Sequence, residues 1–466
     1  MATHVASLYP LPAKEALKEE FVGKSLNDVA TPAAVLDLSK VKSNCNRMLE
    51  AVEALGFGWR VHIKTHKTTE LTRLQVGGGT GPVKIVVSTL VEAENILPLM
   101  LEYKSTGRVL LYSFPISPAA VERLSVISSA IGPGGLSLMV DHPGQLESVS
   151  QIHKSTSITP LIFLKIDMGS HRAGVVPQTD ACYQLIASVV ALETAGTCRL
   201  LGLYSHAGHS YGGNSRAAAV DLLRQEFEAL LVTTEAVHSV LPLRPLILSV
   251  GATPTTTSVR NLLIPDLNAP TDEQTAIAAL RSTIAMVRER KCDIEAHAGV
   301  YPVLDCQQLA THALPTQGPN ALLTWNDLAF TILSEIASIY PGRGKDGSPE
   351  VLVGSGSLAL GREPCKAYDG WGILSPWNRK GVQMPSEDLE KHAGWKVGKI
   401  SQEHGILGWG GKPDEADLFE IGQKVKIWPN HACISGAGFD WYLVVDGSRK
   451  GKEDEIIDVW PRWRGW

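Results

Sequence analysis

A lysine at the end of a short apolar run is the residue of this sequence best placed for chemistry. The stretch GWRVHIKTHKT covers residues 58–68, and the alternating apolar positions before Lys64 predict a short β-strand. A lysine at the end of a buried strand is costly unless it is paired or chemically used, because burial disfavours its charged form. A lowered lysine pKa is also what a Schiff-base lysine needs. The alternative is a strand-end lysine whose amine reaches solvent along its apolar stem.

The composition is that of a folded globular protein and argues against several classes of partner. The chain has 466 residues, of which 44% are hydrophobic and 20% are charged. Its formal net charge of −5 argues against nucleic-acid binding. No apolar run is long enough to cross a bilayer, and the N-terminal stretch lacks the apolar core of a signal peptide. We therefore expect a cytoplasmic protein whose seven cysteines are mostly buried thiols.

Eight short apolar runs alternate with helical patterns through the first two thirds of the chain. This alternation is typical of a (β/α)8 barrel of the TIM type, and a doubly wound open sheet is the alternative. After about residue 310 the helical patterns end, and short apolar runs separated by Gly, Pro and Asp predict a mostly β domain. The eight runs cover residues 60–66, 84–89, 109–114, 136–141, 161–167, 200–206, 245–250 and 292–297.

The length of the chain indicates two domains. We predict an α/β architecture in which the barrel covers residues 31–310 and a mostly β C-terminal domain covers residues 311–466. A strand at residues 34–38, running into an amphipathic helix, would begin the first domain. Residues 1–30 form an N-terminal segment that we expect to pack on the β domain.

Polar side chains follow nearly every predicted barrel strand, and a barrel enzyme carries its site at that face. Tyr204 and His206 stand two apart at a strand end, so they point to the same side. They could stack on a flat heterocycle, or they could simply finish a core strand. Arg172 offers a cation that could meet the phenolate oxygen of a cofactor or pair with Asp167.

Two glycine-containing loops follow the seventh and eighth predicted strands. Backbone N–H groups of a turn such as Gly251 to Thr255 can cradle a phosphate, although a glycine-rich turn alone is a weak signal. The next loop, around Gly299 and Tyr301, follows the eighth strand. These two loops are the usual phosphate site of a (β/α)8 barrel, so together they carry more weight than either one alone.

A histidine and a cysteine stand two apart in the predicted β domain. On an extended chain His431 and Cys433 would point the same way and could share one metal ion. An imidazole and a thiolate favour zinc over magnesium or calcium. Two ligands leave the site incomplete, so water or substrate would complete it, which suits a Lewis acid better than a structural metal.

As a set, these motifs resemble the D-serine dehydratase and D-threonine aldolase family, which has the alanine-racemase-like fold and uses pyridoxal 5′-phosphate (PLP). The matching stretches include HIKTHKT, IDMGSHRAG, LYSHAGHSY, GATPT and PNHAC. The resemblance implies a role for each matched residue. The positions are Lys64 for covalent attachment of PLP, Tyr204 for the face of its ring, Arg172 for its oxygen side, Tyr211, Gly251 and Thr253 for the phosphate or nearby, and His431 and Cys433 for Zn²⁺.

The resemblance further implies zinc-assisted release of pyruvate and ammonia from a small D-amino acid, D-serine. Lys64 would remove the Cα proton, and zinc would draw charge from the departing hydroxyl. Aldolase relatives tend to pair histidine with a carboxylate, so Cys433 favours a dehydratase. The alternatives are a D-threonine aldolase or another lyase for D-β-hydroxy amino acids, an amino-acid racemase, and a non-catalytic PLP-binding protein. A homodimer remains open.

Overall fold

The computed structural model describes residues 8–79, 81–103, 107–264 and 270–466, which form two compact units. The first unit holds Asn46–Gly299 together with residues from both ends of the chain, and the second holds Leu11–Cys45 and Val300–Arg462. Within the described residues, no helix combines the length and the apolar character needed to cross a membrane.

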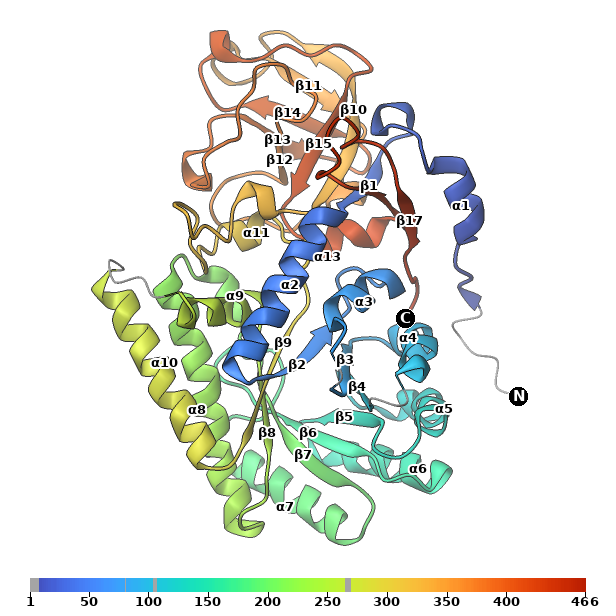
Figure 1. The fold of residues 1–466 in the computed structure, drawn as a ribbon, viewed down its shortest axis with the longest axis vertical. Coiled ribbons are helices and arrows are strands. Elements are labelled where there is room, and N and C mark those ends of the chain that lie inside the picture. Colours follow the sequence, from blue (N-terminus) through green and yellow to red (C-terminus); the bar gives the residue numbers. More distant parts are fainter. Residues whose placement is uncertain (1–7, 80, 104–106, 265–269) are drawn as a thin grey trace. The chain divides into compact units, whose positions relative to one another are not determined.

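The first unit is a closed barrel of eight parallel strands, which confirms the predicted fold (Figure 1). Closure is shown by β2, which pairs with β3 on one side and with β9 on the other, so the open-sheet alternative is excluded. The barrel strands are β2 Gly58–His62, β3 Val83–Val87, β4 Arg108–Pro115, β5 Leu136–Val140, β6 Leu161–Lys165, β7 Arg199–Tyr204, β8 Ile247–Val250 and β9 Asp293–Ala298.

The helices between these strands are amphipathic, and their buried residues face the barrel wall. They are α3 Thr69–Val76, α4 Leu90–Glu102, α5 Val121–Ile131, α6 Leu146–Thr156, α7 Asp180–Thr194, α8 Arg216–Val240, α9 Thr253–Thr257 and α10 Thr271–Glu289.

A buried ion cluster lies inside the barrel. The carboxylate of Glu295 on β9 accepts from Arg60 Nε at 2.7 Å and pairs with Lys84 Nζ at 2.9 Å. Burial alone would raise the pKa of Glu295, but the two cations outweigh it and lower the pKa to about 2. Since all three side chains rise from barrel strands, the cluster ties β2, β3 and β9 together.

Every second residue of a strand points to the same side, so the side chains that face the barrel interior continue in line to the C-terminal end of each strand. Arg60 and His62 share one side of β2, and Phe163 and Lys165 share one side of β6. The apolar layer of the barrel core contains Val86, Leu111, Met139, Phe163 and Tyr204. The polar side chains that end these strands therefore converge on one face.

The second unit is built on one nine-stranded sheet in the order β11-β14-β13-β12-β15-β10-β1-β16-β17. It also contains α1 Lys14–Phe21 and the start of α2 Leu38–Leu55, a helix that continues into the first unit. The strands are β1 Ala33–Asp37, β10 Phe330–Tyr340, β11 Glu350–Val353, β12 Gly372–Leu374, β13 Trp395–Ile400, β14 Gly405–Trp409, β15 Lys424–Pro429, β16 Trp441–Val445 and β17 Asp458–Pro461.

The units differ from the predicted domain boundaries at both ends. Strand β1, predicted as the start of the first domain, belongs to the second unit because it pairs antiparallel with β10 and parallel with β16. Residues 300–310 belong there too. Conversely, the last four residues join the first unit, where Trp463 N donates to the Lys67 carbonyl at 2.9 Å. In the N-terminal segment, Leu17 and Phe21 pack against a core cluster of the second unit.

Candidate active site

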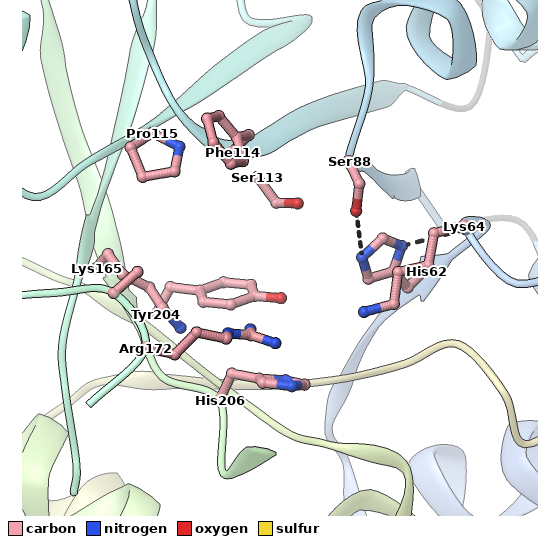
Figure 2. Close-up of a pocket in the computed structure, with 11 residues that line it drawn as sticks. His62, Lys64, Ser88, Ser113, Phe114, Pro115, Lys165, Arg172, Tyr204 and His206 are labelled. Atoms are coloured by element: carbon pink, nitrogen blue, oxygen red, sulfur yellow. Dashed lines mark hydrogen bonds between the residues drawn. The ribbon is translucent and has the colours of Figure 1, made fainter. Parts of the chain in front are cut away.

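A cavity of about 300 Å³ lies in the first unit at the C-terminal ends of the barrel strands (Figure 2). Three cationic side chains and two imidazoles line it, and no aspartate or glutamate is among its lining residues. Such a lining favours a negatively charged ligand. The lining residues are His62, Lys64, Ser88, Ser113, Phe114, Pro115, Lys165, Arg172, Ala173, Tyr204 and His206.

Lys64 projects into the cavity from a tight turn after β2. The Lys67 N–H donates to the Ile63 carbonyl at 2.9 Å and closes this turn, which places Lys67 at φ 51°. Buried His66 anchors the turn to α3, because its Nδ1 accepts from the Thr68 N–H at 3.1 Å. The other nitrogen, Nε2, lies 2.9 Å from Gln75 Oε1 and must therefore donate its proton. The HIKTHK motif thus combines two cavity residues, His62 and Lys64, with the residues that fix the turn.

His62 lines the cavity beside Lys64. Its Nδ1 accepts from the Lys64 backbone N–H at 3.4 Å, so the proton sits on Nε2, which lies 3.2 Å from Ser88 Oγ. Burial, reinforced by the positive charges of Lys64 and Arg172, lowers the pKa of His62 well below its ordinary value. His62 is therefore a neutral imidazole at pH 7.

Tyr204 ends β7, and its ring stacks on the imidazole of His297 with centroids 4.0 Å apart and planes 13° apart. Burial raises the pKa of the Tyr204 phenol, so the phenol keeps its proton at neutral pH. Nearby His206 uses Nδ1 to contact the Gly251 carbonyl at 2.7 Å. The rings of Tyr204 and His206 give the cavity an aromatic wall, and His297 packs behind Tyr204.

Arg172 reaches the cavity from the loop that follows β6. Asp167 at the start of this loop accepts from the backbone N–H of Gly169 and of His171, at 2.9 and 3.0 Å. The carboxylate of Asp167 also lies 3.1 Å from His171 Nδ1. Asp167 thus shapes the loop through its backbone, and Arg172 is left to line the cavity. The predicted contact of Arg172 with a phenolate oxygen of a cofactor stays a prediction.

The turn after β8 is held by Glu226, a fully buried carboxylate on α8. Glu226 accepts from the Gly251 N–H at 3.0 Å, from Thr255 Oγ1 at 2.8 Å and from Ser205 Oγ at 2.9 Å. Burial raises the pKa of Glu226 despite these donors. One side chain therefore joins the ends of β7 and β8.

The other predicted phosphate residues lie around this turn, outside the lining of the cavity. Thr253 is the first residue of α9 and is buried, and Tyr211 is half-buried in the short helix Gly208–Gly212. Gly251 has φ 147°, and a Cβ added there would lie 2.1 Å from the His297 carbonyl oxygen. Only glycine fits that position.

Gly251→Ala is expected to lower the free energy of unfolding by about 1–3 kcal/mol and to weaken cofactor binding. The added methyl group must displace either the His297 carbonyl or Thr256 Oγ1, which would lie 2.2 Å away. Thermal unfolding and titration with PLP measure the two effects. Gly212→Ala is the matched control, because a Cβ there meets no atom within 4 Å. Equal behaviour of the two variants would contradict the steric argument.

His431 and Cys433 lie in the second unit, where His431 precedes the short helix α13 Ala432–Ser435. They were predicted on an extended chain, but Cys433 lies within the first turn of this helix. The two side chains nevertheless contact each other, since the side chain of Cys433 is a hydrogen-bond partner of the His431 imidazole. Burial alone would lower the pKa of His431, but Cys433 outweighs it and raises the pKa to about 9.

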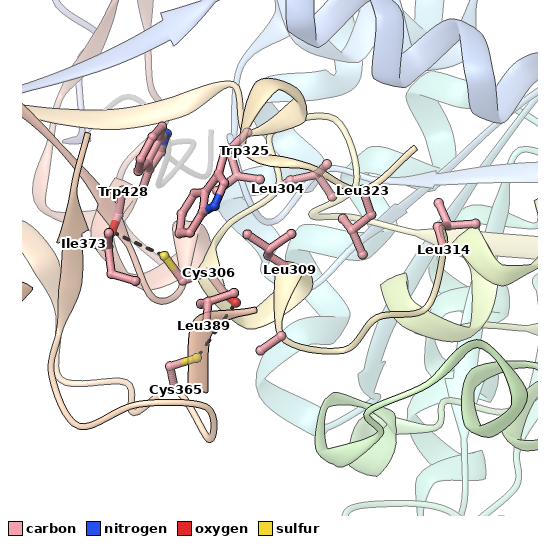
Figure 3. Close-up of a cluster of buried hydrophobic side chains, with 12 residues drawn as sticks. Leu304, Cys306, Leu309, Leu314, Leu323, Trp325, Cys365, Ile373, Leu389 and Trp428 are labelled. Carbon is pink, nitrogen blue, oxygen red and sulfur yellow. Dashed lines mark hydrogen bonds between the residues drawn. The ribbon is translucent and has the colours of Figure 1, made fainter. Parts of the chain in front are cut away.

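The segment from Asp305 to Gln307 positions this pair. Asp305 Oδ2 accepts from the Ala432 N–H at 2.9 Å, and Gln307 Oε1 contacts His431 Nδ1. A buried apolar cluster containing Cys306, Trp325 and Trp428 holds the segment in place (Figure 3). In the described part of the chain, no third His, Cys, Asp or Glu joins the pair as a metal-binding group.

Three functional candidates were missed from the sequence. Lys165 is the last residue of a buried strand, and Lys64 follows one closely, so the signal of a lysine beside a buried strand could have found both. Glu226 lies in the middle of a long helix, and His297 within an apolar run, where nothing in the sequence separates them from ordinary residues.

Comparison with known proteins assigns these features to a family. The model described as "Putative serine dehydratase domain" matches residues 329–445, and the model "Alanine racemase, N-terminal domain" matches residues 36–265. The chain is 36% identical to the D-serine dehydratase of Schizosaccharomyces pombe, with 97% of this chain and 96% of the relative covered. It is 30% identical to the D-serine dehydratase of Saccharomyces cerevisiae, with 96% and 99% covered.

Solved structures show the same fold. The D-threo-3-hydroxyaspartate dehydratase from Delftia sp. HT23 superposes with a TM-score of 0.71 at 24% identity, over 95% of this chain and 100% of that chain. Two further structures with that enzyme name carry alanine in place of a histidine and of a cysteine two positions apart, the second in a metal-free form. Because the sequence likeness to the yeast proteins extends over nearly the whole of both chains, this chain is a member of the D-serine dehydratase family.

Proposed function

We propose that this protein is a PLP-dependent D-serine dehydratase that uses zinc to release pyruvate and ammonia. The observation that carries the proposal is the Lys64 amine in a cationic, carboxylate-free cavity at the C-terminal ends of the barrel strands. Family membership supports the reaction, because relatives at 36% and 30% identity bear the name D-serine dehydratase.

The residues of the cavity fit PLP. An aldehyde needs a primary amine, which Lys64 offers, and the anionic oxygens of PLP need cations, of which Arg172 is one. Its flat ring suits the aromatic wall at Tyr204, and its phosphate suits the turn at Gly251 and Thr253, with Tyr211 nearby. The buried nitrogen Nε2 of His297 and the buried amine of Lys165 have no hydrogen-bond partner among the described residues, as expected where a polar ligand binds.

When bound, PLP would withdraw electrons from the Cα of the amino acid and so favour loss of the Cα proton. The chain itself would supply the base, because Lys64 Nζ, in the cavity, is the amine that would take that proton. Neutral His62 accepts from the Lys64 backbone N–H and holds the turn without adding positive charge. The phenol of Tyr204 keeps its proton and serves as a donor.

His431 and Cys433 fit a zinc ion, because zinc prefers imidazole nitrogen and thiolate sulfur. The side chain of Cys433 is a hydrogen-bond partner of the His431 imidazole, so the two candidate ligands already lie together. A zinc ion held there would act as a Lewis acid on the β-hydroxyl of the substrate. The related dehydratase has a cysteine variant that is described in a metal-free form, which supports a metal at this pair.

The proposed function is tested by product analysis with D-serine, L-serine and D-threonine. We expect pyruvate and ammonia from D-serine and neither product from L-serine. A D-threonine aldolase would instead give glycine and acetaldehyde, because it breaks the Cα–Cβ bond and not the Cβ–O bond. A racemase would give L-serine, and a non-catalytic PLP-binding protein would give no product. Any of these three results would overturn the assignment.

A further inference from the structure

The cavity contains a second amine that the proposed reaction does not use. Lys165, the last residue of β6, is only 6% exposed and lines the cavity (Figure 2). Its Nζ has no hydrogen-bond partner among the described residues, and its one aromatic contact is the Tyr204 ring, 4.7 Å from Nζ to centroid. A buried ammonium without a partner is strongly disfavoured. Lys165 therefore either stays neutral or awaits an anion.

The carboxylates near Lys165 are already occupied by other donors. Asp141 accepts from Gln145 Nε2 at 2.7 Å and from the Gly174 N–H at 3.1 Å. Glu226 holds the ends of β7 and β8, and Asp167 holds its own loop. None of these three acids forms an ion pair with Lys165 in the described part of the chain, so all three contribute only at longer range.

The remaining charged and titratable neighbours do not compensate Lys165 either. Arg172 repels its ammonium form, and His206 and His297 are neutral because burial lowers the pKa of each well below the ordinary value. Burial and the repulsion from Arg172 together lower the pKa of Lys165 to about 7, although Glu226, Asp167 and Asp141 act in the opposite direction. At neutral pH this amine can therefore gain a proton when a negative charge arrives.

We propose that Lys165 adds a second cation beside Arg172 to the anion-binding site of this cavity, and that Lys165 takes up a proton from solvent as the anion enters. The anion is an oxygen of the bound cofactor or the carboxylate of the amino-acid substrate. Because no carboxylate lines the cavity, the negative charge must come with the ligand. The identity of the anion rests on the proposed function, whereas the anion site itself rests on the lining of the cavity.

Two binding experiments separate the two sources of the anion. In the first, PLP is titrated into the apoprotein and followed by absorbance. In the second, D-glycerate is titrated into the holoenzyme. Both titrations are also run by calorimetry in two buffers of different ionisation enthalpy, so that proton uptake is counted in each arm. D-glycerate carries a hydroxyl in place of the amine of D-serine, so it presents the carboxylate but cannot displace Lys64 from the cofactor.

Two variants of Lys165 distinguish the effect of its charge on ligand binding from the effect of its apolar stem. Lys165→Met removes the amine and keeps the apolar stem, and Lys165→Arg carries a permanent charge. Lys154→Met on α6 is the matched control, because the side chain of Lys154 is 70% exposed. We expect Lys165→Met to weaken one of the two ligands by about 10- to 100-fold, the effect of losing a hydrogen bond to a charged group. Lys165→Arg should retain affinity, and the control should match the wild type.

The pH dependence gives a reading that needs no variant. Above a pKa of about 7 the protonated fraction of Lys165 falls about tenfold per pH unit, so affinity should fall accordingly and proton uptake should approach one. The arm that shows these effects identifies the anion as cofactor or substrate. Wild-type binding without proton uptake in either arm, or Lys165→Met binding both ligands normally, would overturn the proposal. Neither arm requires turnover, so a lack of dehydratase activity would count against the proposed function alone.

Discussion

Lys64→Ala is expected to abolish both covalent attachment of PLP and measurable release of pyruvate from D-serine. Loss of the proton transfer alone costs roughly 100- to 10,000-fold in rate, and the alanine variant also loses the covalent bond to the cofactor. Absorbance spectra of the purified protein report the bound cofactor, and a coupled pyruvate assay reports kcat. The substitution should leave the fold intact, because backbone and side-chain hydrogen bonds of Lys67 N, His66 and Thr68 hold the turn.

Lys64→Arg tests whether the amine of Lys64, and not only its positive charge, is required. Arginine keeps a positive charge in the cavity but has neither a nucleophilic amine nor a usable pKa, so it should be as inactive as alanine. Lys154→Ala on the exposed face of α6 controls for the loss of any lysine. Turnover of D-serine at the wild-type rate by Lys64→Ala would remove the basis of the proposed mechanism.

The barrel was predictable from the sequence because buried parallel strands are short apolar runs separated by helices. All eight predicted runs overlap strands β2 to β9. The boundary was harder, since β1 and α2 look like one more strand–helix unit of the barrel. Their assignment depends on pairing with β10, about 300 residues further along the chain. Local patterns carry no information about a partner so distant.

The cavity was predictable where a reactive or charged residue lies at the end of a strand or in the loop that follows it, as Lys64, Tyr204 and Arg172 show by lining one pocket. Parallel strands deliver such residues to one face whatever lies between them in sequence. The residues that hold the loops around the cavity could not be predicted from the sequence. Glu226 satisfies four donors from the middle of a helix, where a glutamate usually faces solvent.

Removal of the metal is expected to lower D-serine turnover by about 100-fold or more, because a Lewis acid supplies several kcal/mol to the departure of a poor leaving group. Pyruvate release is measured before and after treatment with EDTA, and then after addition of Zn²⁺ or Mg²⁺. Zinc should restore activity and magnesium should not, since an imidazole–thiolate pair suits a softer ion.

The variants His431→Gln and Cys433→Ser locate this effect. Both should lose turnover and bound zinc while keeping the cofactor absorbance, because the residues proposed to bind PLP lie in the other compact unit. The carboxylate variant Cys433→Asp keeps an anionic ligand that zinc accepts, so it should recover part of the bound metal. Together these variants distinguish the contribution of the metal from that of the cofactor. Lys64 variants should lose covalently attached PLP, whereas metal-site variants should lose zinc and turnover but keep PLP. Full activity after exhaustive chelation, verified by elemental analysis, would leave His431 and Cys433 as a structural pair and require the chain to protonate the departing hydroxyl by another group.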